Sequence, residues 1–446
     1  MDKRMLETEN IGKLLKKFSI PAIASMLMGI MYNVVDRMFI SIGIGRDGIA
    51  GVSLSLPIFN LFLATALFIG VGAGAMVSIN LGAKKQDRAD KFLGNALVLL
   101  VGLGISYFII GKIFVERILL AFGASEATFG YALDYLEAIL WGAPFLLLFS
   151  GLNNIVRGEG SPKRSMTYGM IGMGLNIVLD ALFIFVFDWG IKGAAWATVI
   201  SSAISVMFYL RHFSLPVSNI KWKKENLKLE FSVVKEILSI GIAPFIMQIS
   251  ASAIMVVMNK VLKINGGDIA VASYGIINSL ILLMRLPVVG LYQGAQPIIS
   301  YNFGAKRNDR VAETLNLTLK IALTMGTVGF LVSFFAPSIL VKPFIKNDPE
   351  LYHLTVNGVR IIFVAVIGLA YNTIATTYFQ SIQKAHITTM LNLGQQVFLI
   401  IPLLLILPNY FGINGAWMAQ PIADVSLAII AFFFIRKEKT NLIKVI

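Results

Sequence analysis

A short polar sequence occurs twice in this chain, at an interval of about half its length. GAKKQDR at 82–88 returns as GAKRNDR at 304–310, which is 222 residues later in a chain of 446 residues. GIKGA at 190–194 and GINGA at 412–416 keep the same interval, and Pro21 corresponds to Pro244 within one residue. Long apolar runs flank each copy of the heptapeptide. Two copies of one apolar unit are typical of a membrane transporter.

The composition also indicates a membrane environment. The chain is 57% hydrophobic and 14% charged, whereas soluble domains carry roughly 25% charged residues. Because about 20 apolar residues cross the hydrocarbon core as a helix, we expect twelve membrane-spanning helices. Their expected ranges are 18–41, 52–81, 92–115, 136–156, 166–187, 193–210, 238–262, 270–300, 314–336, 358–380, 386–408 and 415–435.

The longest polar stretch, 211–236, separates six expected spans from six others. We therefore predict an N-lobe over 1–210, a cytoplasmic linker over 211–236 and a C-lobe over 237–446. An even number of spans gives both copies the same orientation in the membrane, which makes the repeat parallel. The predicted fold class is an all-α membrane protein with two six-helix lobes around a central cavity.

The basic residues predict the orientation. Most of the 38 Lys and Arg residues lie in the loops on one side of the expected spans, together with both termini. An excess of Lys and Arg marks the cytoplasmic side, so we expect both termini in the cytoplasm and the protein in the cell membrane. The net charge of +14 is then explained without nucleic acid, and anionic lipid headgroups are a secondary partner.

Sequence patterns of catalysis are not found in this chain. It has no cysteine, which excludes disulfides and thiolate metal sites, and its three histidines form no metal-binding pattern. A phosphate-binding loop that would indicate direct use of ATP is also missing. We expect a protein that is not an enzyme and that has no cofactor.

Acidic residues inside the spans are the candidates for function, because an ionisable group at the bilayer centre costs about 2.5–3.5 kcal/mol. Asp36 lies in the first span and Asp180 in the fifth. Asn176 shares a helix face with Asp180, and Thr198 lies on the next helix. Carboxylate, amide and hydroxyl oxygens can hold a proton or Na⁺. The alternative for the amide and the hydroxyl is that they only link helices by hydrogen bonds.

The second half of the chain lacks these polar residues. The equivalent positions there are Asn259, Phe398, Pro402 and Gln420. A requirement of the shared fold would appear in both copies, so the asymmetry favours ion coupling in the first half.

Two further ionisable residues have open roles. Asp424 is either a second functional acid or a locally paired residue, and Arg285 is either a counter-ion or a side chain that extends to the membrane surface.

Flexible methionines can accept varied apolar ligands, although any one of them can instead pack or face lipid. The candidate residues of a substrate cavity are Met31, Asn153, Met173, Gln248, Met255 and Arg285.

Taken together, these motifs resemble the multidrug and toxic compound extrusion (MATE) family, most of all its DinF/MepA-like branch. The resemblance covers essentially the whole chain. It rests on VDRMFI at 35–40, the two GAK loops, RGEGSP at 157–162, and the order Asn176, Asp180, Thr198.

The resemblance implies a role for each site residue. The family counterparts of Asp36, Asn176, Asp180 and Thr198 form a first-lobe site for H⁺ or Na⁺, and an amide like that of Asn154 belongs to the surrounding network. The sodium-type NorM branch also has acids in the second lobe. The seventh span here offers Gln248 and Asn259 and no acid lies between Glu236 and Asp268, so such a second site is not expected.

The resemblance implies export of cationic, amphipathic drugs by a monomeric antiporter that alternates between inward and outward openings. Influx of H⁺ or Na⁺ would drive the export. The alternatives are a flippase for lipid-linked precursors from the same superfamily and a membrane scaffold or receptor without transport. A flippase would need a basic cavity, for which Arg285 is the main candidate.

Overall fold

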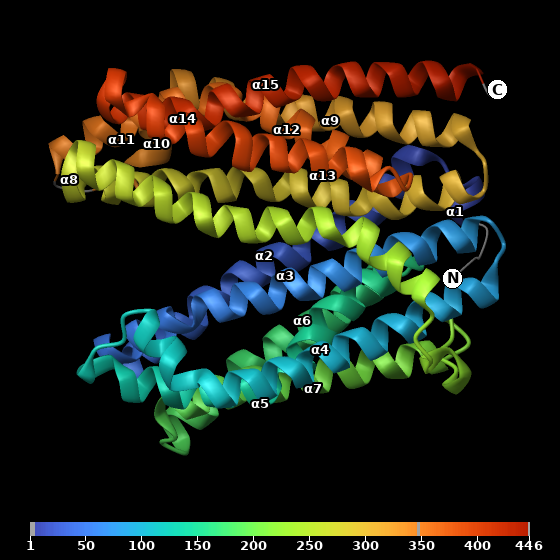
Figure 1. Ribbon diagram of the computed structural model, residues 1–446, viewed down its shortest axis with the longest axis horizontal. Helices are drawn as coiled ribbons and strands as arrows, with labels where there is room; N and C mark the ends of the chain where they lie inside the picture. The colour runs from blue at the N-terminus through green and yellow to red at the C-terminus, as the bar shows by residue number, and fades with distance from the viewer. Residues whose placement is uncertain (1–4, 346–347, 445–446) are drawn as a thin grey trace. The chain divides into compact units, whose positions relative to one another are not determined.

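The computed structural model describes residues 5–345 and 348–444 (Figure 1). Residues 1–4 and 445–446, which belong to the termini predicted to be cytoplasmic, lie outside this range. The elements are α1 (Met5–Thr8), α2 (Ile11–Gly43), α3 (Arg46–Gly82), α4 (Gln86–Ala121), α5 (Glu126–Gly158), α6 (Pro162–Ala181), η1 (Leu182–Val186), α7 (Gly190–Ser214), η2 (Lys224–Leu227), α8 (Phe231–Gly304), α9 (Asn308–Phe335), α10 (Pro337–Val341), α11 (Pro349–Ile362), η3 (Phe363–Ala365), α12 (Val366–Ser381), α13 (Ala385–Leu393), η4 (Gly394–Ile400), α14 (Ile401–Ile406) and α15 (Pro408–Lys444).

The helices confirm the predicted fold class. Within the described residues, 11 helices are long and apolar enough to cross a membrane. One of them, α8, has 74 residues and bends at Gly267, where φ is 67°. Because about 20 residues suffice for one crossing, α8 supplies two spans and the total is twelve.

The chain forms two compact units. The first comprises Met1–Glu9 and Ala24–Phe245, and the second comprises Asn10–Ile23 and Ile246–Ile446. Helices α2 and α8 therefore each contribute residues to both units. Pro21 and Pro244, which correspond in the repeat, lie within two residues of the points at which these helices change unit.

Each unit is built around one central helical segment. In the first unit, α5 contacts α3, α4, α6 and α7. In the second unit, α12 contacts α9, α13 and α15, and α15 also packs against α11 and α14. The segments α5 and α11–α12 occupy the same place in the repeat, so the duplicated sequence yields the same packing role.

The repeated loops have the same backbone conformation. Lys84 has φ 59° and its counterpart Lys306 has φ 58°. A positive φ is unfavourable for a residue with a Cβ, so the residues around each lysine must hold it in this conformation. Gly190 and Gly412 also agree, with φ of 56° and 55°. The duplication found in the sequence is thus a duplication of turns as well as of helices.

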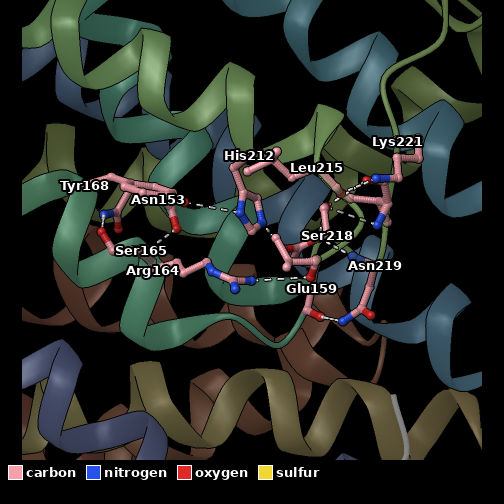
Figure 2. A network of polar contacts seen from close by, with 12 residues as sticks. Asn153, Glu159, Arg164, Ser165, Tyr168, His212, Leu215, Ser218, Asn219 and Lys221 are labelled. Carbon is pink, nitrogen blue, oxygen red and sulfur yellow. Dashed lines mark hydrogen bonds and ion pairs between the residues drawn. The ribbon is translucent and has the colours of Figure 1, made fainter. Parts of the chain in front are cut away.

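A buried network fixes the start of the segment after α7 to the turn between α5 and α6 (Figure 2). One carboxylate oxygen of Glu159 accepts from Ser218 Oγ at 2.6 Å and from Asn219 N at 3.1 Å, and the other contacts His212 Nε2. Glu159 and His212 are both buried. A buried carboxylate is tolerated only with such partners. At this turn the interval is 223 residues, since Gly160 and Gln383 both have a positive φ, and the residue equivalent to Glu159 is the apolar Ile382.

The same segment is also bound to the start of α4. The Asp90 carboxylate accepts from Lys221 N at 2.9 Å. Lys223 Nζ lies 3.1 Å from Asp90 and 3.2 Å from Asp87, and these carboxylates raise the pKa of Lys223. Asp87 belongs to the first copy of the repeated heptapeptide. This loop therefore holds the chain that leads from α7 to α8 against the first unit.

We expect Glu159→Gln to release this segment. The neutral amide loses the charge-assisted hydrogen bonds from Ser218 and Asn219, a loss of about 1–3 kcal/mol. Limited trypsin digestion should then cut after Lys221 roughly tenfold faster, since 1.4 kcal/mol corresponds to a factor of ten. Glu225→Gln, which changes an exposed glutamate in the same segment, is the matched control. Equal cleavage of the two variants would show that the network does not hold the segment.

Candidate functional site

The two acids singled out in the sequence lie together in the first unit. Asp36 is on α2 and Asp180 is near the end of α6, and both are buried. Their side chains are hydrogen-bonded to each other. An ionised carboxylate only accepts hydrogen bonds, so a bond between two carboxyl groups requires a shared proton. The pair is thus arranged to hold one proton between two helices.

Asn176 and Thr198 extend the pair onto α7. In the orientation that satisfies both ends of its amide, Asn176 donates from nitrogen to Asp180 Oδ2 at 2.7 Å. Its oxygen accepts from the backbone N–H of Thr198 at 3.1 Å and from the hydroxyl at 3.2 Å. The structure therefore brings together four of the five residues predicted for the coupling site, and Asn154 is the one that lies elsewhere.

Two tyrosines also belong to the site and were missed from the sequence. Tyr32 lies close to Thr198 and to Asp36. Its position one helical turn before Asp36 places both on one face of α2 and could have revealed it. Tyr135 is buried on α5 and lies within electrostatic range of Asp36 and Asp180. The predicted fourth span began at residue 136, so Tyr135 was placed outside the membrane helix.

Close packing at the end of α2 holds Asp36 against α6. A Cβ on Gly43 would lie 2.3 Å from Ile184, so only glycine allows this approach. Phe39 stacks edge to face on Phe185, with ring centroids 5.6 Å apart. Ile184 and Phe185 belong to η1, a π-helical turn that directly follows the helix of Asp180. Such turns occur frequently at functional sites.

The asparagines at the end of α5 lie away from this pair. Asn154 follows Tyr135 by 19 residues on the same helix, which is about 28 Å at 1.5 Å per residue. Its amide oxygen accepts from Arg157. Asn153 donates to the Tyr209 hydroxyl at 2.8 Å. The structure thus places both amides near the turn between α5 and α6.

The candidate cavity residues are divided between the units. Met31, Asn153 and Met173 belong to the first unit, and Gln248, Met255 and Arg285 belong to the second. Met31 and Met255 are 62% and 48% exposed, so their thioethers are accessible. Their contact with a substrate stays a prediction.

Asp424, whose role the sequence left open, has partners in the second unit. Its carboxyl is buried on α15 and accepts from the amide of Gln395 on η4. Arg285 on α8 interacts with it electrostatically. Asn372 donates to the backbone carbonyl of Asp424 at 2.8 Å. The acid is therefore hydrogen-bonded to an amide and interacts electrostatically with a guanidinium.

Solved structures share the fold of this chain. A crystal structure described as MATE in the bent conformation has a TM-score of 0.93 and 23% identity, and the alignment covers 100% of this chain and 99% of the other. A second, described as the outward-facing conformation of a multidrug resistance MATE family transporter of the MOP superfamily, has a TM-score of 0.90 and 24% identity, with 99% of each chain covered. These similarities establish the fold.

Sequence comparison adds the family. A multidrug export protein MepA from Staphylococcus haemolyticus is 28% identical over 436 residues, covering 98% of this chain and 96% of that protein. A MepA from Staphylococcus aureus strain MSSA476 is 28% identical over 433 residues, covering 96% and 94%. The MatE family model matches residues 21–182 and 242–406, which correspond to each other in the repeat. The chain therefore belongs to the MatE family, whose members are multi-pass membrane transporters and not enzymes.

Proposed function

We propose that this protein exports cationic, amphipathic compounds in exchange for protons, with Asp36 and Asp180 as the coupling site. The observation that carries the proposal is the hydrogen bond between two buried carboxyl groups in the first unit. A packing role alone would not need two titratable groups within membrane-spanning helices. The relatives named multidrug export proteins support the same class of activity for this chain.

The local geometry favours H⁺ over Na⁺ as the coupling ion. A sodium ion takes oxygen ligands, whereas Asn176 directs its amide nitrogen toward Asp180. A proton needs only the two carboxyl oxygens that already face each other.

Coupling follows from the charge of the pair. Without the shared proton, the two carboxylates attract a cationic compound. The shared proton lowers the charge of the pair from −2 to −1 and so weakens the binding of the compound. Because such coupling is reciprocal, the compound also promotes release of the proton. Each charge that moves inward yields about 2.3 kcal/mol per 100 mV of membrane potential.

We also propose the arrangement in the cell. The basic loops support cytoplasmic termini and insertion in the cytoplasmic membrane. The repeat supports an N-lobe over 1–210, a linker over 211–236 and a C-lobe over 237–446. All four coupling residues come from one unit of one chain, so we infer that a monomer is sufficient for transport.

Proteoliposomes loaded with a cationic dye test the choice of ion. We expect efflux to accelerate when an inward proton gradient is imposed, and to stay at the passive rate under an inward Na⁺ gradient at equal pH. Liposomes without protein give the passive rate. Efflux driven by Na⁺ alone would assign the site to sodium, and no acceleration by either gradient would reject cation coupling.

A further inference from the structure

The chain between α7 and α8 is held level with the expected start of a membrane span. Asn95 donates from its side-chain amide to the backbone oxygens of Asn226 and Lys228, at 3.3 Å each. A Cβ on Gly94 would lie 2.3 Å from the same Asn226 oxygen, so η2 packs directly on α4 there. Gly94 and Asn95 lie just inside the span expected over 92–115. This part of the chain is therefore close to the membrane boundary.

The held segment directs apolar side chains outward. Asn226 is buried, whereas four apolar residues around it are exposed, namely Trp222 at 42%, Leu227 at 38%, Leu229 at 53% and Phe231 at 83%. The hydrogen bonds from Asn95 to the backbone prevent the segment from turning these side chains inward. A single exposed apolar residue is ordinary, but four within ten residues of a fixed segment indicate a surface that contacts something apolar.

The exposed charges of this segment are mainly basic. Between residues 221 and 236, three lysines are exposed, namely Lys224, Lys228 and Lys235, against one exposed acid, Glu225. The other two acids are paired with bases of α4. Glu230 lies 2.7 Å from Lys91, and Glu236 lies 2.5 Å from Arg88. The charge of the outer surface is therefore positive, which is complementary to an anionic membrane.

The shared fold does not require this segment. In the second half of the chain, α15 continues as a helix to Lys444. With the interval of 222 residues, the position equivalent to Asn95 is the apolar Leu317. The amide that holds the segment and the apolar residues that it exposes thus belong to the first half alone. This difference favours a role of their own over a role in packing.

We propose that residues 222–231 form an interfacial anchor for anionic phospholipids. Trp222 and the exposed apolar side chains lie at the headgroup level of the membrane, where amphipathic segments bind. Lys224 and Lys228 pair with the phosphates of the lipids. Bound lipid then adds to the hydrogen bonds that hold the chain leading from α7 to α8. The inference is independent of the proposed export function.

A spin label measures the depth of this segment in the full-length protein. The chain has no cysteine, so Leu229→Cys creates one labelling site, and an exposed position tolerates the label. Oxygen concentrates in lipid and a neutral nickel chelate stays in water, so collisions with each report the surroundings of the label. In mixed vesicles of phosphatidylcholine and phosphatidylglycerol, we expect a several-fold lower nickel accessibility than for Lys85→Cys, an exposed site in the first repeated loop.

The dependence on charge distinguishes anionic lipid from apolar contact alone. Combined Lys224→Gln and Lys228→Gln should reduce the lipid-bound population of the segment about fivefold per lysine, which corresponds to about 1 kcal/mol each. The label at Leu229→Cys should then become accessible to the nickel chelate, as it should in vesicles of phosphatidylcholine alone. Lys263→Gln changes an exposed lysine at the other end of the spans and should leave the accessibility unchanged.

Two results would overturn the anchor. If Leu229→Cys is as accessible to the nickel chelate as Lys85→Cys in the mixed vesicles, the surface does not bind lipid and is left for a protein partner. If its protection persists both in phosphatidylcholine alone and after the two lysine substitutions, the contact is apolar only and the assignment to anionic lipid is wrong.

Discussion

Proton-driven export should be lost when Asp36 is replaced by Asn. The amide keeps the size and the polarity of the side chain, but it cannot bind or release a proton. Coupling between two ligands of a protein is typically 5–150-fold in affinity, and in Asp36→Asn the effect of pH on dye affinity should disappear. Dye efflux from proteoliposomes under an inward proton gradient should fall to the rate of liposomes without protein.

The outcome of Asp180→Asn should be the same, because the proton is shared by the two carboxyl groups. Asp47→Asn, which changes an exposed acid at the start of α3, is the matched control and should export at the normal rate. Full export by both Asp36→Asn and Asp180→Asn under the gradient would contradict the assignment of the coupling site.

The largest effect on stability is expected for Gly241→Ala. A Cβ at Gly241 would lie 1.6 Å from the backbone carbonyl oxygen of Phe68. A side chain could yield, but here the obstacle is the backbone of α3, so the start of α8 would have to move. Overpacking of a tight contact costs about 1–3 kcal/mol and occasionally more, and we expect this variant at the upper end. Thermal unfolding in detergent, followed by tryptophan fluorescence, measures the loss.

Gly102→Ala gives the contrast for this experiment. No atom lies within 4 Å of a Cβ placed on Gly102, which is also in a helix of the first unit. Alanine is favoured over glycine in a helix by about 0.5–1 kcal/mol, so this variant should unfold at the same or a higher temperature. Similar destabilisation of both variants would show that the contact of Gly241 with Phe68 is not what limits stability.

The repeat and the helical periodicity predicted much of the fold and the centre of the site. Two copies of one apolar pattern specify the class and the number of spans, because hydrophobic length alone decides which segments cross a bilayer. The four-residue interval from Asn176 to Asp180 placed both on one helix face. Acids are rare inside membrane helices, so Asp36 and Asp180 were both predicted to belong to one functional site.

Contacts between helices could not be predicted from the sequence in the same way. The acidic residues Glu126 and Asp134 end the apolar pattern early, so the sequence placed the start of the fourth span after Tyr135, although α5 begins at Glu126. The approach of α2 to α6 at Gly43 depends on the rotation of one helix against another, which no single-helix periodicity encodes. The electrostatic interaction of Arg285 with Asp424 likewise involves helices that are distant in the sequence.

Proton release on dye binding tests the central claim most directly. A pH indicator in a weakly buffered detergent solution reports protons that leave the purified protein when a cationic dye is added. The account predicts release of about one proton per bound dye by the unaltered protein, as linkage requires for a shared proton that competes with a cation, and none by Asp36→Asn. Dye binding without proton release, or equal release by Asp36→Asn, would contradict it.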